Sequence, residues 1–454
     1  MKTYQDLMAV GQDEKARIAF IRSAIEDHRG SAAYRTALDA EFYYDGENPT
    51  INRYEKILYD MQGKAHRDMW TANHKLASHF FGFAVDQSVS YLLGNGIVFG
   101  EKETAGKLCK DFSQEVMSAA RSAKIGGVAF GFWDLDHLRV FDLREFVPLY
   151  DEEDGALKAG IRFWRVTPDK PLRATLYEID GFTEYFQPKN KDMETMQEKR
   201  AYKLIVRSAE IGATEILDGE NYPSFPVVPL KNNRRCKSEI VGKRNTIDAL
   251  DLATSNMVNN VDEGNLIYWV LTNCGGMDDL DDAKFVERLK TLHVAHADGD
   301  DGAKATPQTI EAPYQGTQTT IDMLEKKLYQ DFQCFDAASI TAGNQTATAI
   351  LASYTPLDLK TDKFEDEVTR FVVEVLRLAG IDDAPSYTRN RIINTAEETQ
   401  TLLLGAQYYD DEYITKKLLS INGDIDQYED MMKRKAEEEI DRSFAEPVID
   451  DEAE

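Results

Sequence analysis

The sequence predicts a mainly helical α+β protein, because three kinds of segment follow one another along its 454 residues. Apolar residues recur at helical spacing in the first quarter of the chain and again over its second half. Between them, over residues 126–208, short apolar–polar alternations are separated by Asp, Gly and Pro turns, as in an antiparallel β region. A chain of this length is expected to form two to four structural units rather than one.

The N-terminal part is expected to be helical. Ile18, Ile21 and Ile25 share one face of a helix, and Gly30 follows where a C-terminal cap would lie. Turn residues in the segment YYDGENPTI then separate the first two helices from two more. The ranges expected for the second, third and fourth helices are up to Phe42, roughly 66–92 and approximately 103–123.

After the β region, residues 225–245 are expected to form an irregular connector, since they hold two prolines and the densest basic cluster of the chain. A helix should begin at Thr246, and a β-like run, LIYWVLT, follows it. A short amphipathic helix, DAKFVERLKTL, and a polar loop come next. Another helix is predicted from the apolar positions Ile321, Leu324, Leu328, Phe332 and Phe335.

The last hundred residues are also expected to be helical. Pro356 should kink or interrupt the helix that contains it. A well-formed apolar face then runs from Phe364 to Ala379 and stops at Gly380. Thr395 and Glu398 have the spacing of a capping box, and the chain ends in an acidic tail.

Composition limits the classes of function. The chain has 53 basic and 80 acidic residues, a formal charge of −27, which opposes the phosphate neutralisation on which tight nucleic-acid binding depends. Acidic walls would instead suit DNA that slides past a surface without adhering. Neither a membrane-spanning apolar run nor an N-terminal export pattern is present, so no membrane association and no export by this route are expected. Cysteines without CxxC spacing indicate reduced thiols rather than a zinc site or a disulfide scaffold: Cys109, Cys236, Cys274 and Cys334.

Motifs for catalysis are missing from the sequence. It has no GxxxxGK[ST], GxSxG, HExxH or dinucleotide-binding glycine pattern. The loop 293–302 could form a small metal site, but a solvated turn is the simpler interpretation. The residues of such a site would be His293, His296, Asp298, Asp300 and Asp301. A paired-carboxylate nuclease site is poorly supported. We therefore predict no enzyme activity, no catalytic residue, no cofactor and no metal.

One cluster of basic residues is the place where phosphate contact is conceivable, because six cations lie within fourteen residues. The alternative is an exposed connector, or a contact between subunits in which these cations pair with acidic neighbours. The residues are Lys231, Arg234, Arg235, Lys237, Lys243 and Arg244.

Several local sequences, taken in their order along the chain, give a more specific indication. They include YYDG (43–46), Asn48 and Ile51, and then Asn73, Lys75, Asp86, Tyr91 and Gly94 within NHKLASHFFGFAVDQSVSYLLGNGI. GGVAFGFWDLD, FVPLYDEEDG, PVVPLKNN, IDALDLATSNMVNNVDE and GNQTATAILASYTPLDLK (343–360) follow in that order. Together these segments, over roughly residues 40–435, resemble the bacteriophage portal family (head-to-tail connectors) typified by the portal of a Bacillus siphophage.

The resemblance implies a portal fold with wing, stem, clip and crown, in a subunit that forms a ring. The implied parts are a wing (1–239), a stem helix (240–264), a clip (265–315), a second stem helix (316–339), a tunnel loop with a kinked wing helix (340–385), and a crown with the acidic tail (386–454). The tunnel loop would offer hydroxyls and amides to moving DNA without a fixed cation, although a plain helix–helix turn would look similar. Its residues are Thr341, Asn344, Gln345, Thr346 and Thr348.

The function implied by the resemblance is mechanical. A ring of about twelve copies would sit at the capsid portal vertex of the virion and pass double-stranded DNA during packaging and ejection. Its implied partners are the terminase large subunit, capsid and scaffold proteins, and the head–tail adaptor, and it would be made in the host bacterial cytoplasm. A metal-dependent DNA-processing enzyme and another minor head structural protein are the alternatives.

Overall fold

The computed structural model contains two compact units, which are considered one at a time. Unit 1 comprises Met1–Phe335 and Pro356–Arg389, and unit 2 comprises Asp336–Thr355 and Asn390–Glu454. The structure describes residues 2–59, 62–68, 72–101, 103–189, 191–208, 214–264, 268–272, 304–308, 314–338, 347–391, 395–422, 428 and 430–435. Helix and sheet are mixed, with more helix than strand, which confirms the coarse fold class.

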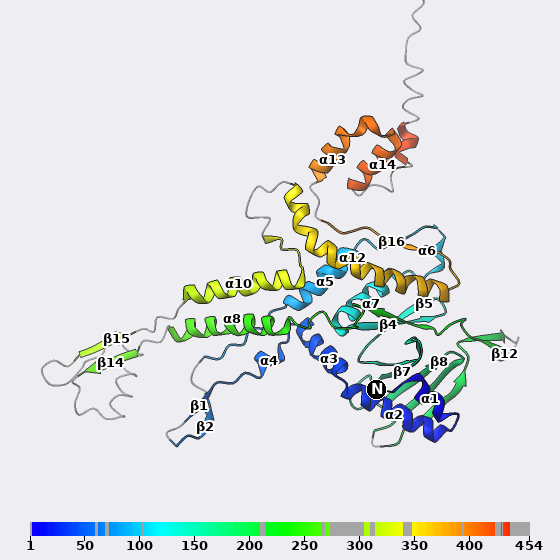
Figure 1. The fold of residues 1–454 in the computed structure, drawn as a ribbon, viewed down its shortest axis with the longest axis horizontal. Coiled ribbons are helices and arrows are strands. Elements are labelled where there is room, and N and C mark those ends of the chain that lie inside the picture. Colours follow the sequence, from blue (N-terminus) through cyan, green and yellow to red (C-terminus); the bar gives the residue numbers. More distant parts are fainter. Residues whose placement is uncertain are drawn as a thin grey trace, which may run out of the picture. The chain divides into compact units, whose positions relative to one another are not determined.

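Four helices open unit 1 (Figure 1): α1 (Tyr4–Val10), α2 (Glu14–Gly30), α3 (Ala32–Tyr44) and α4 (Pro49–Asn52). The first turn of each is capped by a side-chain oxygen that accepts a backbone N–H, from Thr3, Asp13, Ser31 and Asn48 respectively. The predicted apolar stripe of α2 is confirmed, since Ile21 and Ile25 are buried and Ile18 packs beside them.

The β region predicted between residues 126 and 208 is confirmed. A five-stranded antiparallel sheet has the order β10-β9-β8-β7-β6, and α2 packs on β6 and β7 through Ile21 and Ile25. Its strands are β6 (Phe146–Tyr150), β7 (Leu157–Trp164), β8 (Leu172–Glu178), β9 (Gly181–Gln187) and β10 (Glu194–Arg200). The strands β11 (Lys203–Ser208) and β12 (Thr214–Glu220) form a separate antiparallel pair.

A second sheet corrects the prediction of an irregular connector over residues 225–245. β13 (Val227–Lys231) pairs with β4 (Val128–Asp134), which in turn pairs with β5 (His137–Asp142). The connector was judged from its prolines, but Pro229 is tolerated because β13 is an edge strand. The remainder of the segment, up to Lys243, does lack a helix or strand.

The main core of unit 1 is built around two helices that the sequence places far apart. α7 (Phe112–Gly126) packs on β4, β5, α3 and α5 (Phe80–Leu93). From α12 (Ala347–Leu378), the predicted apolar face joins the same core through buried side chains from Phe364 to Val375. α12 is not interrupted at Pro356, contrary to one of the two expected outcomes. Near this core lie α6 (Thr104–Lys107) and the pair β3 (Ile97–Phe99) and β16 (Pro385–Tyr387).

Two long helices lie side by side in opposite directions (Figure 1). They are α8 (Arg244–Gly264) and α10 (Tyr314–Phe332), as expected from their apolar spacing. The prediction is wrong for Phe335, which lies beyond the end of α10, because Gln333 has a φ of +53° and ends the helix. The chain between them contains the antiparallel pair β14 (Tyr268–Thr272) and β15 (Lys304–Gln308). The predicted helix DAKFVERLKTL lies outside the described residues.

Residues 66–92 do not form one helix, and this prediction is wrong in its first half. β1 (Ile57–Tyr59) and β2 (Ala65–Arg67) form a hairpin, residues 72–79 form neither helix nor strand, and α5 is the helical part of the described residues in this range. We call residues 72–79 the strap. The predicted helix over 103–123 is likewise divided into α6 and α7.

Unit 2 contains the beginning of α12 and a small helical cluster. The cluster consists of α13 (Thr395–Leu404), the 3-10 turn η1 (Ala406–Tyr408) and α14 (Asp411–Asn422). α13 begins at Thr395, within one residue of the predicted helix start, and the side chains of the expected capping box lie outside the described residues. The rings of Tyr409 and Tyr413 stack at 5.2 Å between η1 and α14.

Candidate functional site at the base of the helix pair

Four charged side chains meet where α8 and α10 join the body of unit 1. Lys124 comes from α7, Glu239 and Lys243 precede α8, and Lys360 comes from α12. One Glu239 carboxylate oxygen accepts from the ammonium groups of Lys243 (2.8 Å) and Lys360 (3.1 Å), and the other lies 3.9 Å from Lys124 Nζ. We call this group the junction cluster. It places three cations around one carboxylate in the interior of the protein.

Further contacts tie the junction cluster to α10. The ammonium of Lys360 donates to the carbonyl of Phe332, the last residue of α10, at 2.8 Å. Lys243 Nζ lies 4.3 Å from the centre of the Phe332 ring. A cation at a helix C-terminus is favourable, because the carbonyls there carry partial negative charge. The junction cluster therefore fixes the end of α10 beside the start of α8.

Burial sets the protonation of the junction cluster. The side chain of Lys124 is only 1% exposed, and this burial lowers its pKa to about 7 although Glu239 opposes the shift. Burial alone would raise the pKa of Glu239, but the ammonium groups of Lys360, Lys124 and Lys243 outweigh it and hold that pKa well below its ordinary value. Near neutral pH, Glu239 is thus ionised while Lys124 is close to its midpoint.

The strap is bound along α8 by a ladder of side chains. The backbone N–H groups of His74, Leu76 and Ser78 donate to Asn259 (2.7 Å), Ser255 (2.9 Å) and Asp251 (3.0 Å). Two residues of extended chain advance about 6.8 Å, close to the roughly 6 Å rise of four helical residues, so alternate N–H groups meet every fourth side chain. The three acceptors are buried, although all are polar.

The beginning of α8 is held by residues at and after the end of α3. The amide nitrogen of Asn48, a residue 1% exposed, donates to Asp248 (2.9 Å) and Asp251 (2.8 Å), while its oxygen caps α4. The Tyr43 hydroxyl donates to Asp248 at 2.5 Å, and its ring lies under the guanidinium of Arg244. Burial raises the pKa of Asp251. These contacts give a structural reason for the YYDG and Asn48 segments.

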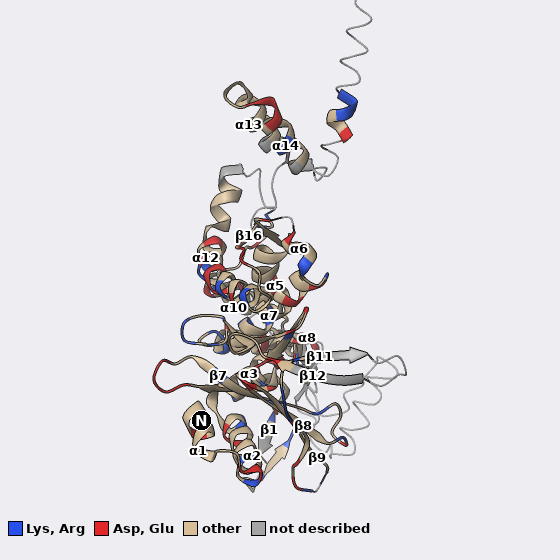
Figure 2. Cartoon of the chain, turned by 90° about the vertical axis from the view of Figure 1, so that its right-hand side faces the viewer, with Lys and Arg blue, Asp and Glu red and all other residues tan. Residues whose placement is uncertain are grey.

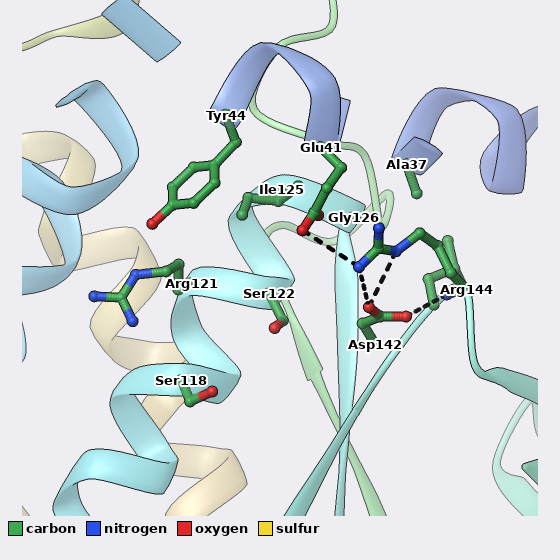
Figure 3. A pocket seen from close by; sticks show the side chains of 11 residues that line it. Ala37, Glu41, Tyr44, Ser118, Arg121, Ser122, Ile125, Gly126, Asp142 and Arg144 are labelled. Atoms are coloured by element: carbon green, nitrogen blue, oxygen red, sulfur yellow. Dashed lines mark hydrogen bonds and ion pairs between the residues drawn. The ribbon is translucent and has the colours of Figure 1, made fainter. Parts of the chain in front are cut away.

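A polar pocket of about 120 Å³ lies near α3, α7 and β5 (Figure 3). Arg144 enters it and pairs with Asp142 (2.6 Å) and Glu41 (3.3 Å). On the other side, Arg121 pairs with Asp86 at 2.8 Å. Burial raises the pKa of Glu41 despite the Arg144 charge. Because its charges are already matched within the chain, this pocket looks like part of the packing between helices rather than a binding site.

The structure separates the predicted basic cluster into two groups. Lys243 belongs to the junction cluster, and Arg244 pairs with Asp39 at 2.7 Å, so both meet acidic residues of the same chain. The other four lie on or after β13: Lys231 lines a groove of about 300 Å³ beside α12, and the remaining three are exposed on the following turn. These three are Arg234, Arg235 and Lys237.

Other predicted site residues fall largely outside the described residues. Of the expected tunnel loop, Thr341, Asn344, Gln345 and Thr346 are not described, and Thr348 lies in the first turn of α12. His293, His296, Asp298, Asp300 and Asp301, weighed as a metal site, are not described either. Within the described ranges, no three His, Cys, Asp or Glu side chains are grouped so that they could hold a metal ion.

Sequence reasoning missed the junction cluster and the ladder under the strap. Nothing in the sequence shows that Lys124, Glu239 and Lys360 meet, because they lie more than a hundred residues apart. The ladder left a visible trace, since Asp251, Ser255 and Asn259 repeat every four residues beside the apolar stripe of α8.

A family profile decides the relationship of this chain to known proteins. The profile described as "Phage portal protein, SPP1 Gp6-like" matches residues 24–443. The chain belongs to this phage portal family. Its role is that of a phage portal, and the family is structural, with members that are components of virions and form ring assemblies. Over the described part of the chain, none of the helices combines the length and the apolar character of a membrane span.

Individual portal proteins agree with the family profile. The portal protein of Clostridium phage phiCD119 is 23% identical over 401 residues, which cover 81% of this chain and 85% of that protein. The portal protein of Bacillus phage SPP1 is 22% identical over 395 residues, covering 80% and 76% respectively. A solved chain from "Neck of empty GTA particle computed with C6 symmetry" has a TM-score of 0.44 and 10% identity, covering 76% of this chain and 90% of that one. The assignment does not depend on it.

Proposed function

We propose that about twelve copies of this chain close into a ring at the capsid portal vertex, and that double-stranded DNA passes through its centre. α8 and α10 would line the channel as stem helices. Terminase would dock on the end that protrudes from the head, and the head–tail adaptor would later replace it. Capsid and scaffold proteins would contact the outside of the ring, after synthesis in the host cytoplasm.

The α8–α10 pair is the observation that carries this proposal. Its buried apolar side chains lie at the end near the junction cluster, and they are Ile247 and Leu250 of α8 and Leu328 and Phe332 of α10. Farther out, Val261 is 45% and Met323 60% exposed. Two amphipathic helices in a single layer cannot bury both their faces. Neighbouring copies, packed side by side in a ring, would cover these faces.

The parts of the ring are proposed from the family architecture. The wing would be residues 1–239, the stem 240–264 and 316–339, the clip 265–315, the tunnel loop with its wing helix 340–385, and the crown 386–454. In this arrangement the junction cluster joins the wing to both stem helices. A force applied to the stem would therefore reach the wing through Glu239 and its three lysines.

Charge supports passage of DNA rather than retention. The chain has an excess of acidic residues, and Figure 2 shows acidic and basic positions interspersed along α12. Phosphates are held by arrays of cations, so a channel of this composition would release DNA readily. The expected tunnel loop, from Thr341 to Thr348, would add polar contacts without a cation.

Negative-stain imaging combined with native mass determination of the full-length protein tests the proposal. We expect rings with a central hole and a mass of about twelve copies. Assembly should be tried with and without the scaffold protein of the same phage, since a vertex ring is built during head assembly. A compact monomer or dimer under both conditions would overturn the proposal. Metal-dependent cleavage of DNA by that species would point to an enzyme instead.

A further inference from the structure

The hairpin of β1 and β2, together with its described flanks, forms an arm that we define as residues 53–59 and 62–68. Each strand has three residues, with Ile57 opposite Arg67 and Tyr59 opposite Ala65. Alternate residues of a strand point to the same side, so these four side chains share one face of the hairpin. The face is open, because Ile57 is 53% and Tyr59 is 73% exposed.

A hairpin this small does not stabilise itself. Two strands alone are marginally stable in water, and they usually need a third strand or a packed helix to cover one face. All three residues of β2 are exposed. Within the described part of the chain, Ile57 and Tyr59 keep most of their surface exposed, so apolar contact with a second surface would stabilise the hairpin.

The base of the arm is firmly attached, in contrast to its open face. Asp68 N–H donates to Lys56 O at 2.9 Å, and Lys56 Nζ donates to Ala72 O at 2.9 Å. Lys75 Nζ donates to Asn52 O at 2.6 Å. The strap then continues along α8 through its ladder of side chains. The arm is thus connected to α8 through the strap, so a force on the arm would also act on α8.

Charge indicates what covers the open face. Residues 53–75 carry five basic and three acidic side chains, whereas the whole chain carries 53 basic and 80 acidic ones. The arm and its attachment are therefore positive on a strongly acidic protein. Opposite charge steers such a segment toward another molecule of the same acidic chain.

We propose that the arm packs the face formed by Ile57 and Tyr59 against a second copy of this chain, the next one in the ring. This inference rests on the proposed ring. Each copy would contact one neighbour through its own arm and receive the arm of the other neighbour, as a head-to-tail ring requires. Because the strap is hydrogen-bonded along α8, this contact with the neighbouring copy would be connected to α8.

The test compares two matched double variants of the full-length protein. Ile57→Ser with Tyr59→Ser removes the apolar face of the arm, and Val166→Ser with Ile179→Ser changes two side chains of similar exposure, 78% and 50%, in the β region. Mass photometry over a concentration series measures assembly. We expect the arm variant to need about tenfold more protein, or more, for half-assembly, and the control to match the wild type.

A covalent measurement accompanies this comparison. Benzoylphenylalanine in place of Tyr59 should yield crosslinked dimers on irradiation, whereas the same group in place of Val166 should not. Rings that form equally well in the arm variant, without crosslinks from position 59, would overturn the inference and leave the ring proposal intact. A wild-type chain that forms no ring, even with scaffold, would overturn both.

Discussion

The ammonium of Lys360 donates to the carbonyl of Phe332 at 2.8 Å while also meeting Glu239 at 3.1 Å. One side chain of α12 therefore holds the last residue of α10 and the acidic centre of the junction cluster. Glu239 lies a few residues before α8, so the contacts of Lys360 fix the positions of both α8 and α10 relative to α12. A movement of α12 would therefore displace the start of α8 and the end of α10 together.

Replacement of Glu239 by Ala should destabilise unit 1 severely. It leaves Lys124, Lys243 and Lys360 close together with no counter-charge, and removal of one partner of a buried ion pair costs about 3–5 kcal/mol. Urea unfolding followed by circular dichroism measures the change. Glu325→Ala, on the exposed face of α10, is the matched control and should cost less than about 0.5 kcal/mol. Equal costs would mean that the junction cluster contributes no stability.

The stability of the protein should depend on pH through Lys124. Its pKa is about 7 in the folded chain and near its ordinary value of 10.5 when unfolded. Between these values the unfolded chain holds one more proton, so the contribution of Lys124 to the free energy of unfolding rises with pH, by at most about 1.4 kcal/mol per unit. Below pH 7 both states are protonated and this contribution is constant.

Lys124→Met isolates that contribution. The difference in unfolding free energy between wild type and this variant should change steadily from pH 7 to pH 9, in favour of the wild type at higher pH. Chemical denaturation at several pH values measures it. A difference that stays constant across this window would contradict a depressed pKa for Lys124.

The ladder under the strap predicts a local effect. Ser255→Ala removes the acceptor of the Leu76 N–H and should cost about 1–2 kcal/mol, since that donor lies against α8 with no replacement in the ladder. Hydrogen exchange should accelerate at Leu76, and more weakly at His74 and Ser78. Thr254→Ala serves as the comparison, because its hydroxyl bonds only within α8, to Leu250 O. Unchanged exchange in the strap would argue against the ladder.

Two neighbouring glycines at the end of α7 should respond differently to Ala. Gly127 has a φ of +92°, and a Cβ there would lie 2.3 Å from the carbonyl oxygen of Cys236. A Cβ on Gly126 would meet its neighbours at 3.5 Å or more. We expect Gly127→Ala to lower stability by at least about 2 kcal/mol and Gly126→Ala to be nearly neutral. Thermal melting of both variants measures the difference. Similar melting temperatures would contradict the steric clash expected at Gly127.

The spacing of apolar residues was sufficient to predict the helices and strands whose buried side chains recur at that spacing. The stripes of α2, α8, α10 and α12 were all predicted, because apolar side chains at helical spacing on each of them enter a core. The antiparallel region from β4 to β11 was predicted from its alternation and turns. Family resemblance, rather than any single motif, supplied the function.

The errors have a common physical origin. The strap contains apolar residues at spacing that suits a helix, yet it is extended because α8 provides acceptors for its N–H groups. The strand β13 was not predicted because Pro229 argues against a strand, although an edge strand tolerates a proline. Likewise Lys124, Glu239 and Lys360 carry no local mark of burial, and only the tertiary fold brings them together. Contacts between distant segments decided each of these cases.

Antiparallel pairing of the strap with α8 permits the arm to be placed only in steps of two residues. Sliding the strap by a single residue would turn the N–H groups of His74, Leu76 and Ser78 away from their acceptors. A slide by two residues would leave one acceptor empty and displace the hairpin by about 6.8 Å. The reach of the arm is thus adjustable only in whole steps, and deletion or insertion of one residue in the strap would shift it out of phase.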